Sequence, residues 1–189
     1  HRYLDQGARL PLVHADGVAF SVDAIRRSRR DDRPVLLAET GAVNDRHSGP
    51  FRYYRHDDQG SIFADTTFPA FFAAAAGTGH IWHWDRYVDE KNLWDGYEPI
   101  AQLIDGVALD REGFQPIDCS TPRAWVLGLR GRHHLLLWVR NRADRWDHVL
   151  RDRREAPTLD DVTVDLAAMG LGAARIELCR GWREAIGPA

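Results

Sequence analysis

The residue in this sequence that is best placed for chemistry is Glu39, which follows the apolar run 34–38 and is separated from Gly41 by one residue. An apolar run without polar alternation is typical of a strand covered on both faces, as in a parallel sheet wrapped by helices. A glutamate at the carboxyl end of such a strand lies where parallel α/β folds carry their catalytic groups. The alternative is a structural glutamate that caps a loop or pairs with an arginine.

A second group of candidate residues, Trp82, Trp84 and Asp85, lies in the segment 79–85. Strand alternation predicts that the two tryptophans point to one side and Ile81 to the other. Paired tryptophans are more often part of a core, but flat aromatic faces beside a few polar groups are also what carbohydrate binding requires. The solvent exposure of Trp84 separates these interpretations, because a fully buried ring cannot stack on a sugar.

We expect alternating strands and helices over residues 1–111 to position these groups. Residues 1–5 alternate as a short strand with His1 and Tyr3 on one side, and 35–38 form a later strand. Between them a helix over 21–30 is expected, with Ser21 as its N-cap and with Val22 and Ile25 facing inward. A strand, a helix and a strand joined by short links imply parallel pairing and a right-handed crossover.

The next segments continue this pattern. Residues 40–60 are expected to form a long polar loop, which in a compact domain is usually functional or mobile. A buried helix over 66–76 follows and tolerates Pro69 only in its first turn. A further helix is expected over 97–106, with its apolar stripe facing inward.

A linker that contains glycine and proline is expected over residues 111–122, at the start of a second module that begins near residue 112, and the chain beyond it carries a β pattern. The runs 124–129 and 134–139 predict a hairpin with a short turn that contains glycine. The runs 162–166 and 174–179 are expected to be two further strands. The sequence therefore predicts a small antiparallel β-sandwich as a second domain.

Composition excludes several classes of function. The 189 residues are 44% hydrophobic and 28% charged with a net charge of −3, which is ordinary for a soluble globular protein and gives no basic surface for nucleic acid or anionic membranes. No apolar run could span a bilayer. Cys119 and Cys179 are too few and too far apart for a metal motif or a disulfide framework. The sequence predicts no metal or other cofactor, and it leaves the oligomeric state open.

Taken in order, the motifs His-x-Tyr, Pro-Val-Leu-Leu-Ala-Glu-x-Gly and Trp-x-Trp-Asp resemble the C-terminal part of clan A retaining glycoside hydrolases. These are the (β/α)8-barrel enzymes related to cellulases and mannanases. The resemblance implies an α/β fold in which residues 1–111 are the last strands and helices of a (β/α)8 (TIM) barrel. Residues 112–189 would be the appended β-sandwich. It also implies export to the extracellular space or periplasm and a β-linked oligo- or polysaccharide as substrate.

The resemblance implies a role for each candidate residue. Glu39 would be the nucleophile, with Tyr3 donating a hydrogen bond to its carboxylate. The residues implied to bind the sugar are His1, Trp84, Trp82 and Asp85. Hydrogen bonds donated to the ionised carboxylate would keep its pKa low and fix its orientation.

A retaining glycosidase needs two carboxyl groups about 5 to 5.5 Å apart, one to attack the anomeric carbon and one to protonate the leaving oxygen. The resembling enzymes take the second from an Asn-Glu pair, which does not occur in this sequence. We therefore expect the chain to be a fragment that is inactive and marginally stable by itself, with the acid/base outside it.

Two other classes of function stay open. The chain could be a non-catalytic carbohydrate-binding module that uses Trp82, Trp84 and the aromatic loop 51–54. It could also be a structural or interaction domain whose tryptophans belong to the core.

Overall fold

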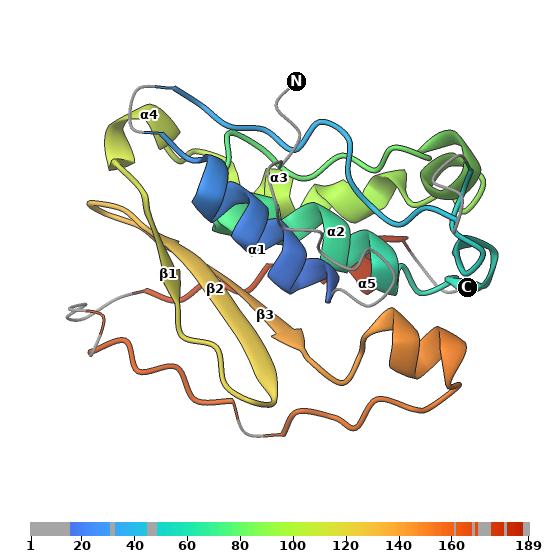
Figure 1. Ribbon diagram of the computed structural model, residues 1–189. Helices are drawn as coiled ribbons and strands as arrows, with labels where there is room; N and C mark the ends of the chain where they lie inside the picture. Colours follow the sequence, from blue (N-terminus) through green and yellow to red (C-terminus); the bar gives the residue numbers. More distant parts are fainter. Residues whose placement is uncertain are drawn as a thin grey trace.

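The computed structural model of the protein describes residues 16–30, 33–44, 49–160, 162–167, 169, 175–179 and 181–186. Helices pack on one face of a three-stranded antiparallel sheet (Figure 1). The α-helices are α1 (Gly17–Ser28), α2 (Ser61–Phe72), α3 (Glu98–Ile104), α4 (Leu109–Glu112) and α5 (Trp182–Ile186). The strands are β1 (Gln115–Asp118), β2 (Ala124–Arg130) and β3 (Leu135–Asn141). Short 3-10 helices span Tyr54–His56 and Trp94–Tyr97, and π-helices span Asp85–Asp89 and Asp147–Arg151.

The sheet has the order β1-β2-β3, and both pairs of strands are antiparallel. The predicted hairpin is confirmed: β2 and β3 pair from Arg130 opposite Leu135 to Ala124 opposite Asn141. Strand β1 lies in the region expected to be a linker. Its pairing with β2 turns the hairpin into a sheet.

Helix α1 begins earlier than the sequence predicted, because Asp16 rather than Ser21 is its N-cap. The Asp16 carboxylate accepts hydrogen bonds from the backbone N–H groups of Val18 (3.0 Å) and Ala19 (3.2 Å), as short polar residues do at helix starts. Ser21 lies inside the helix and is buried. Val22 and Ile25 face the core, as predicted.

Helix α2 also starts earlier than predicted, at Ser61 instead of residue 66. The buried Asp57 carboxylate accepts hydrogen bonds from the N–H groups of Ser61 (2.9 Å) and Ile62 (2.7 Å), which satisfies two donors at the helix start. Pro69 therefore lies in the C-terminal half of the helix and not in its first turn. All residues of α2 are buried, because the helix packs against α1, β2 and β3.

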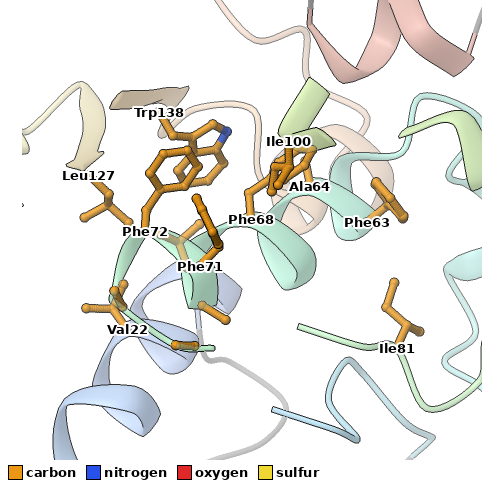
Figure 2. Packing of buried hydrophobic residues seen from close by; sticks show 14 of the residues in the cluster. Val22, Phe63, Ala64, Phe68, Phe71, Phe72, Ile81, Ile100, Leu127 and Trp138 are labelled. Atoms are coloured by element: carbon orange, nitrogen blue, oxygen red, sulfur yellow. The ribbon is translucent and has the colours of Figure 1, made fainter. Parts of the chain in front are cut away.

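The hydrophobic core is built around α2 and includes residues of the sheet, of α1 and of the segments that follow α2 in the chain (Figure 2). Phe72 stacks on Trp138 with ring centroids 6.2 Å apart, and Phe68 packs against the same indole at 6.0 Å. Val22 of α1 and Leu127 of β2 belong to the same cluster. The predicted boundary at residue 112 lies within a shared hydrophobic cluster, and the division into two domains stays a prediction.

A buried ion cluster joins the sheet to two helices. Arg140 of β3 donates to Asp65 of α2 (2.8 Å) and to Asp144, and its guanidinium lies 4.8 Å from the ring centroid of Trp182 in α5. Arg183 donates to Asp144 at 2.6 Å. Burial raises the pKa of Asp65 to about 6, although the neighbouring Arg140 lowers it.

The expected TIM-barrel portion and β-sandwich are wrong. Among the residues that the structure describes, the only sheet is β1-β2-β3, so a barrel wall and a second sheet are both absent from this part. The runs 162–165 and 175–179 form no strand. The physical reason lies in α2, because the helix buries its apolar residues against the hairpin strands instead of a parallel sheet.

No helix in the described part of the chain combines the length and the apolar character that crossing a membrane requires.

Candidate functional site

Two extended segments, 35–40 and 76–82, run parallel and place the predicted site residues side by side. The Thr40 N–H donates to the His80 carbonyl (2.8 Å), and the Trp82 N–H donates to the Thr40 carbonyl (2.9 Å). These bonds form a parallel bridge between Thr40 and Ile81. Glu39 lies one residue before the bridge and Trp82 one residue after it. The backbone therefore brings the candidate nucleophile next to the tryptophan segment.

The segment 35–38 is not the doubly covered strand that its apolar sequence predicted. Val35 and Leu37 are half-buried against the core, whereas Leu36 (47% exposed) and Glu39 face solvent. The described residues give this segment a single paired neighbour. Within that part of the chain no second segment pairs with its other side, and the side chains of residues 35–38 alternate between core and solvent.

Strand alternation in the segment 79–85 stops at Ile81, which is buried in the core. The chain then turns, and a π-helix begins at Asp85. Trp82 and Trp84 both project into solvent, with 52% and 53% of their surface exposed. The exposure of Trp84 excludes the interpretation that this tryptophan belongs to the core.

A third exposed tryptophan, Trp94, lies beside Trp84 and was missed by the sequence reasoning. Its ring centroid is 6.2 Å from that of Trp84, with an angle of 52° between the ring planes, and 44% of Trp94 is exposed. Its indole N–H donates to Asp89 at 3.1 Å. The signal in the sequence was Asn92, whose positive φ of 52° turns the chain back toward Trp84. We call Trp84 and Trp94 the aromatic platform; the exposed Trp82 precedes it in the sequence, and its ring stacks on His83 with centroids 5.5 Å apart.

Two buried tyrosines connect the loop after Glu39 to the helix after Trp84. The Tyr54 hydroxyl accepts from the Ala42 N–H (2.9 Å) and donates to the Ala42 carbonyl (2.7 Å). Its ring stacks on Tyr87 with centroids 4.2 Å apart and planes inclined by 11°. Burial raises the pKa of Tyr54 well above its ordinary value, so the hydroxyl stays protonated and able to donate.

Tyr87 belongs to the π-helix Asp85–Asp89, and its hydroxyl donates to the buried Asp57 and accepts from the N–H of Phe63 (2.9 Å). The same Asp57 carboxylate caps α2. The Tyr54–Tyr87 pair thus attaches both halves of the candidate site to the first turn of the central helix.

Gly41 allows the loop after Glu39 to pass close to Tyr54. Its φ of 102° lies in the region that favours glycine. A Cβ atom at this position would lie 2.9 Å from the Tyr54 hydroxyl. A side chain at residue 41 would therefore both strain the backbone and displace the tyrosine.

The structure brings together only some of the predicted site residues. Glu39 is exposed, and its carboxylate makes no hydrogen bond or ion pair within the described residues. His1 and Tyr3, its expected neighbours, lie outside the described residues. Asp85 is exposed at the end of the platform and lies 3.6 Å from the Arg86 guanidinium.

The aromatic loop 51–54 does not present its rings as a binding surface. Tyr54 is 2% exposed. Phe51 and Tyr53 are partly buried and pack against Trp146, with ring centroids 5.0 and 5.4 Å from it. This part of the carbohydrate-module interpretation is wrong, because these rings pack on one another instead of facing a ligand.

No group of three or more histidine, cysteine or acidic side chains in the described ranges could hold a metal ion. Cys119 and Cys179 are exposed free thiols.

Comparisons of this chain with protein families, with curated proteins and with solved structures found no match.

Proposed function

We propose that this chain supplies the nucleophile and the sugar-binding platform of a retaining β-glycoside hydrolase that acts on a β-linked oligo- or polysaccharide. One observation carries the proposal: the exposed Glu39 and the exposed Trp82 lie on two paired backbone segments, and the exposed Trp84 follows Trp82 by two residues. A carboxylate beside flat apolar faces is the combination that a sugar ring and its anomeric carbon require.

In the proposed reaction, the Glu39 carboxylate attacks the anomeric carbon while the bond to the leaving oxygen breaks and an acid gives that oxygen a proton. The resulting glycosyl ester is then hydrolysed by water, which the same acid, now a base, deprotonates. The acid/base lies outside these 189 residues in this proposal. The chemistry depends on the spacing of two carboxyl groups and not on a (β/α)8 barrel.

The aromatic platform would hold the substrate for this attack. The apolar face of a sugar ring covers an indole, and its hydroxyls reach polar groups at the edge, among which Asp85 is one. Because substrates of this kind lie outside the cytoplasm, export to the extracellular space or periplasm belongs to the same proposal.

The proposal predicts that Glu39 forms a covalent glycosyl ester. An activated 2-deoxy-2-fluoro-β-glycoside that carries dinitrophenolate needs no acid catalyst, because its leaving group departs without a proton. We expect the chain to gain the mass of one fluoroglycosyl unit, and peptide mapping to place that unit on Glu39. Trp84→Ala should slow the labelling, because the sugar loses its stacking face.

Two variants make this test specific. Glu39→Gln removes the nucleophile and should abolish labelling, whereas Glu90→Gln changes another exposed glutamate and should leave it intact. If neither the gluco- nor the manno-configured reagent labels Glu39, the proposed nucleophile is wrong. Hydrolysis of an ordinary aryl β-glycoside by the chain alone, abolished by Glu39→Gln, would contradict the acid/base lying outside it.

A non-catalytic carbohydrate-binding module is the second candidate. The exposure of Trp82 and Trp84 favours this function. So does the observation that, among the residues that the structure describes, none donates a hydrogen bond to the Glu39 carboxylate. In this case the chain binds insoluble polysaccharide, Glu39→Gln binds equally well, Trp84→Ala does not bind, and no glycosyl ester forms. The labelling and binding measurements together separate the two functions.

A further inference from the structure

Trp94 is held in a fixed orientation at the surface. Its indole N–H donates to Asp89, and its ring stacks on Tyr97 with centroids 6.5 Å apart and planes inclined by 28°. Trp84 contacts it from another side. An exposed aromatic side chain that its neighbours already orient loses little conformational entropy when a ligand covers it.

The two neighbouring indoles offer separate stacking faces. The 52° angle between the planes of Trp84 and Trp94 prevents one flat ring from lying on both. A single sugar therefore covers one indole, and the second indole is covered only by the next sugar of a chain. Inclined faces suit a chain whose successive rings are rotated relative to each other.

The surroundings of these rings are acidic. Between Trp82 and Tyr97 the sequence has four carboxylates and two cations. Both cations are engaged: Arg86 lies 3.3 Å from Glu90, and Lys91 pairs with Asp58. A polyanionic saccharide would meet repulsion at this surface, whereas a neutral one would not.

We propose that Trp94 forms a second stacking position next to Trp84, and that the site takes a neutral β-linked saccharide of at least two sugar units. This inference rests on the function proposed above and adds the minimum length and the charge class of its substrate.

The test is isothermal titration calorimetry on the full chain with β-linked gluco- and manno-saccharides of increasing length, starting from the monosaccharide. With the unchanged protein, we expect the disaccharide to bind about tenfold more tightly than the monosaccharide, which is the order of one additional aromatic contact. Trp94→Ala should remove this gain, so that the disaccharide binds no more tightly than the monosaccharide. Trp94→Phe should keep part of the gain, and an oligo-uronate should not bind.

Leu109→Ala is the control, because Leu109 is also exposed but belongs to α4. Circular dichroism spectra of all variants verify that they are folded. If the saccharides bind through Trp84 and Trp94→Ala keeps the disaccharide gain, the second stacking position is wrong while the proposed function stands. If oligo-uronates bind as tightly as the neutral saccharides, the proposed preference for a neutral substrate is wrong. If the unchanged protein binds no saccharide, both the proposed function and this inference fail.

Discussion

At the scale of single residues, the positions of Glu39 and Trp84 relative to each other depend on residues that are neither exposed nor chemically reactive. Tyr54 holds the backbone of Ala42 through two hydrogen bonds, and its ring stacks on Tyr87. No pattern in the sequence separates this tyrosine from its neighbour Tyr53, since both lie in one aromatic run. Only the packing assigns Tyr54 to the interior.

Tyr54→Phe should keep the stacking on Tyr87 but leave the N–H and carbonyl of Ala42 without their partner. Such a loss costs about 1–3 kcal/mol, so we expect the free energy of unfolding in urea to fall by that amount. The rate of Glu39 labelling should fall as well, because the loop loses its anchor.

Tyr53→Phe is the matched control for this measurement. The hydroxyl of Tyr53 makes no hydrogen bond within the described part of the chain, so this variant should change stability little. Equal losses in both variants would mean that the bonds to Ala42 do not stabilise the fold.

At the scale of elements, predictions succeeded where a local pattern was sufficient. The hairpin followed from two apolar runs around a glycine, and the inner face of α1 followed from Val22 and Ile25. The start of α2 could not be predicted, because Asp57 caps it from within the expected loop and is itself bonded by Tyr87, a residue distant in sequence. Tertiary contacts decided that helix boundary.

For the candidate site too, local patterns in the sequence named some residues and left out another. The sequence named Glu39 and the tryptophans Trp82 and Trp84 as candidate site residues, and the parallel bridge joins the segments of Glu39 and Trp82. Trp94 was missed because its approach to Trp84 depends on a positive φ at Asn92, which no periodic pattern encodes. The expected barrel was wrong because an apolar run does not specify which sheet covers it.

The connection between α4 and the hairpin predicts a pH dependence of stability. Glu112 accepts hydrogen bonds from the N–H groups of His133 (2.9 Å) and His134 (3.2 Å), and His134 Nδ1 lies 2.8 Å from its carboxylate. These bonds lower the pKa of Glu112 from 4.5 to about 2. Because the pKa is lower in the folded state, the stabilisation is complete above pH 4.5 and is lost as the pH falls toward about 2.

Urea unfolding of the unchanged protein and of Glu112→Gln measures this effect. We expect the unchanged protein to be the more stable of the two near neutral pH, and the difference to shrink as the pH approaches about 2. A difference that is independent of pH would show that the charge of Glu112 contributes nothing.

At the scale of the whole molecule, the buried cluster around Arg140 connects β3, α2 and α5. A buried ion pair is weak evidence for stability by itself, but the removal of one partner leaves a charge without compensation. Arg140 pairs with two buried carboxylates, Asp65 and Asp144. Because Arg183 also pairs with Asp144, Asp65 is the carboxylate that depends on this one cation.

Arg140→Met should therefore reduce the free energy of unfolding by about 3–5 kcal/mol, measured by urea titration. A double variant that adds Asp65→Asn removes the uncompensated charge and should recover part of the loss. Arg27→Met breaks an exposed pair with Asp23 and should cost less than about 1 kcal/mol. If Arg140→Met costs no more than Arg27→Met, the cluster does not hold the layers together.

Lys91 is a single site for chemical labelling, close in sequence to the aromatic platform. It is the only lysine in the sequence, and it lies on the turn between the π-helix Asp85–Asp89 and Trp94. An amine-reactive fluorophore therefore finds a single side-chain amine in these 189 residues, three residues before Trp94 in the sequence. Quenching of that fluorophore by the neighbouring tryptophans would report ligand binding without any engineered cysteine.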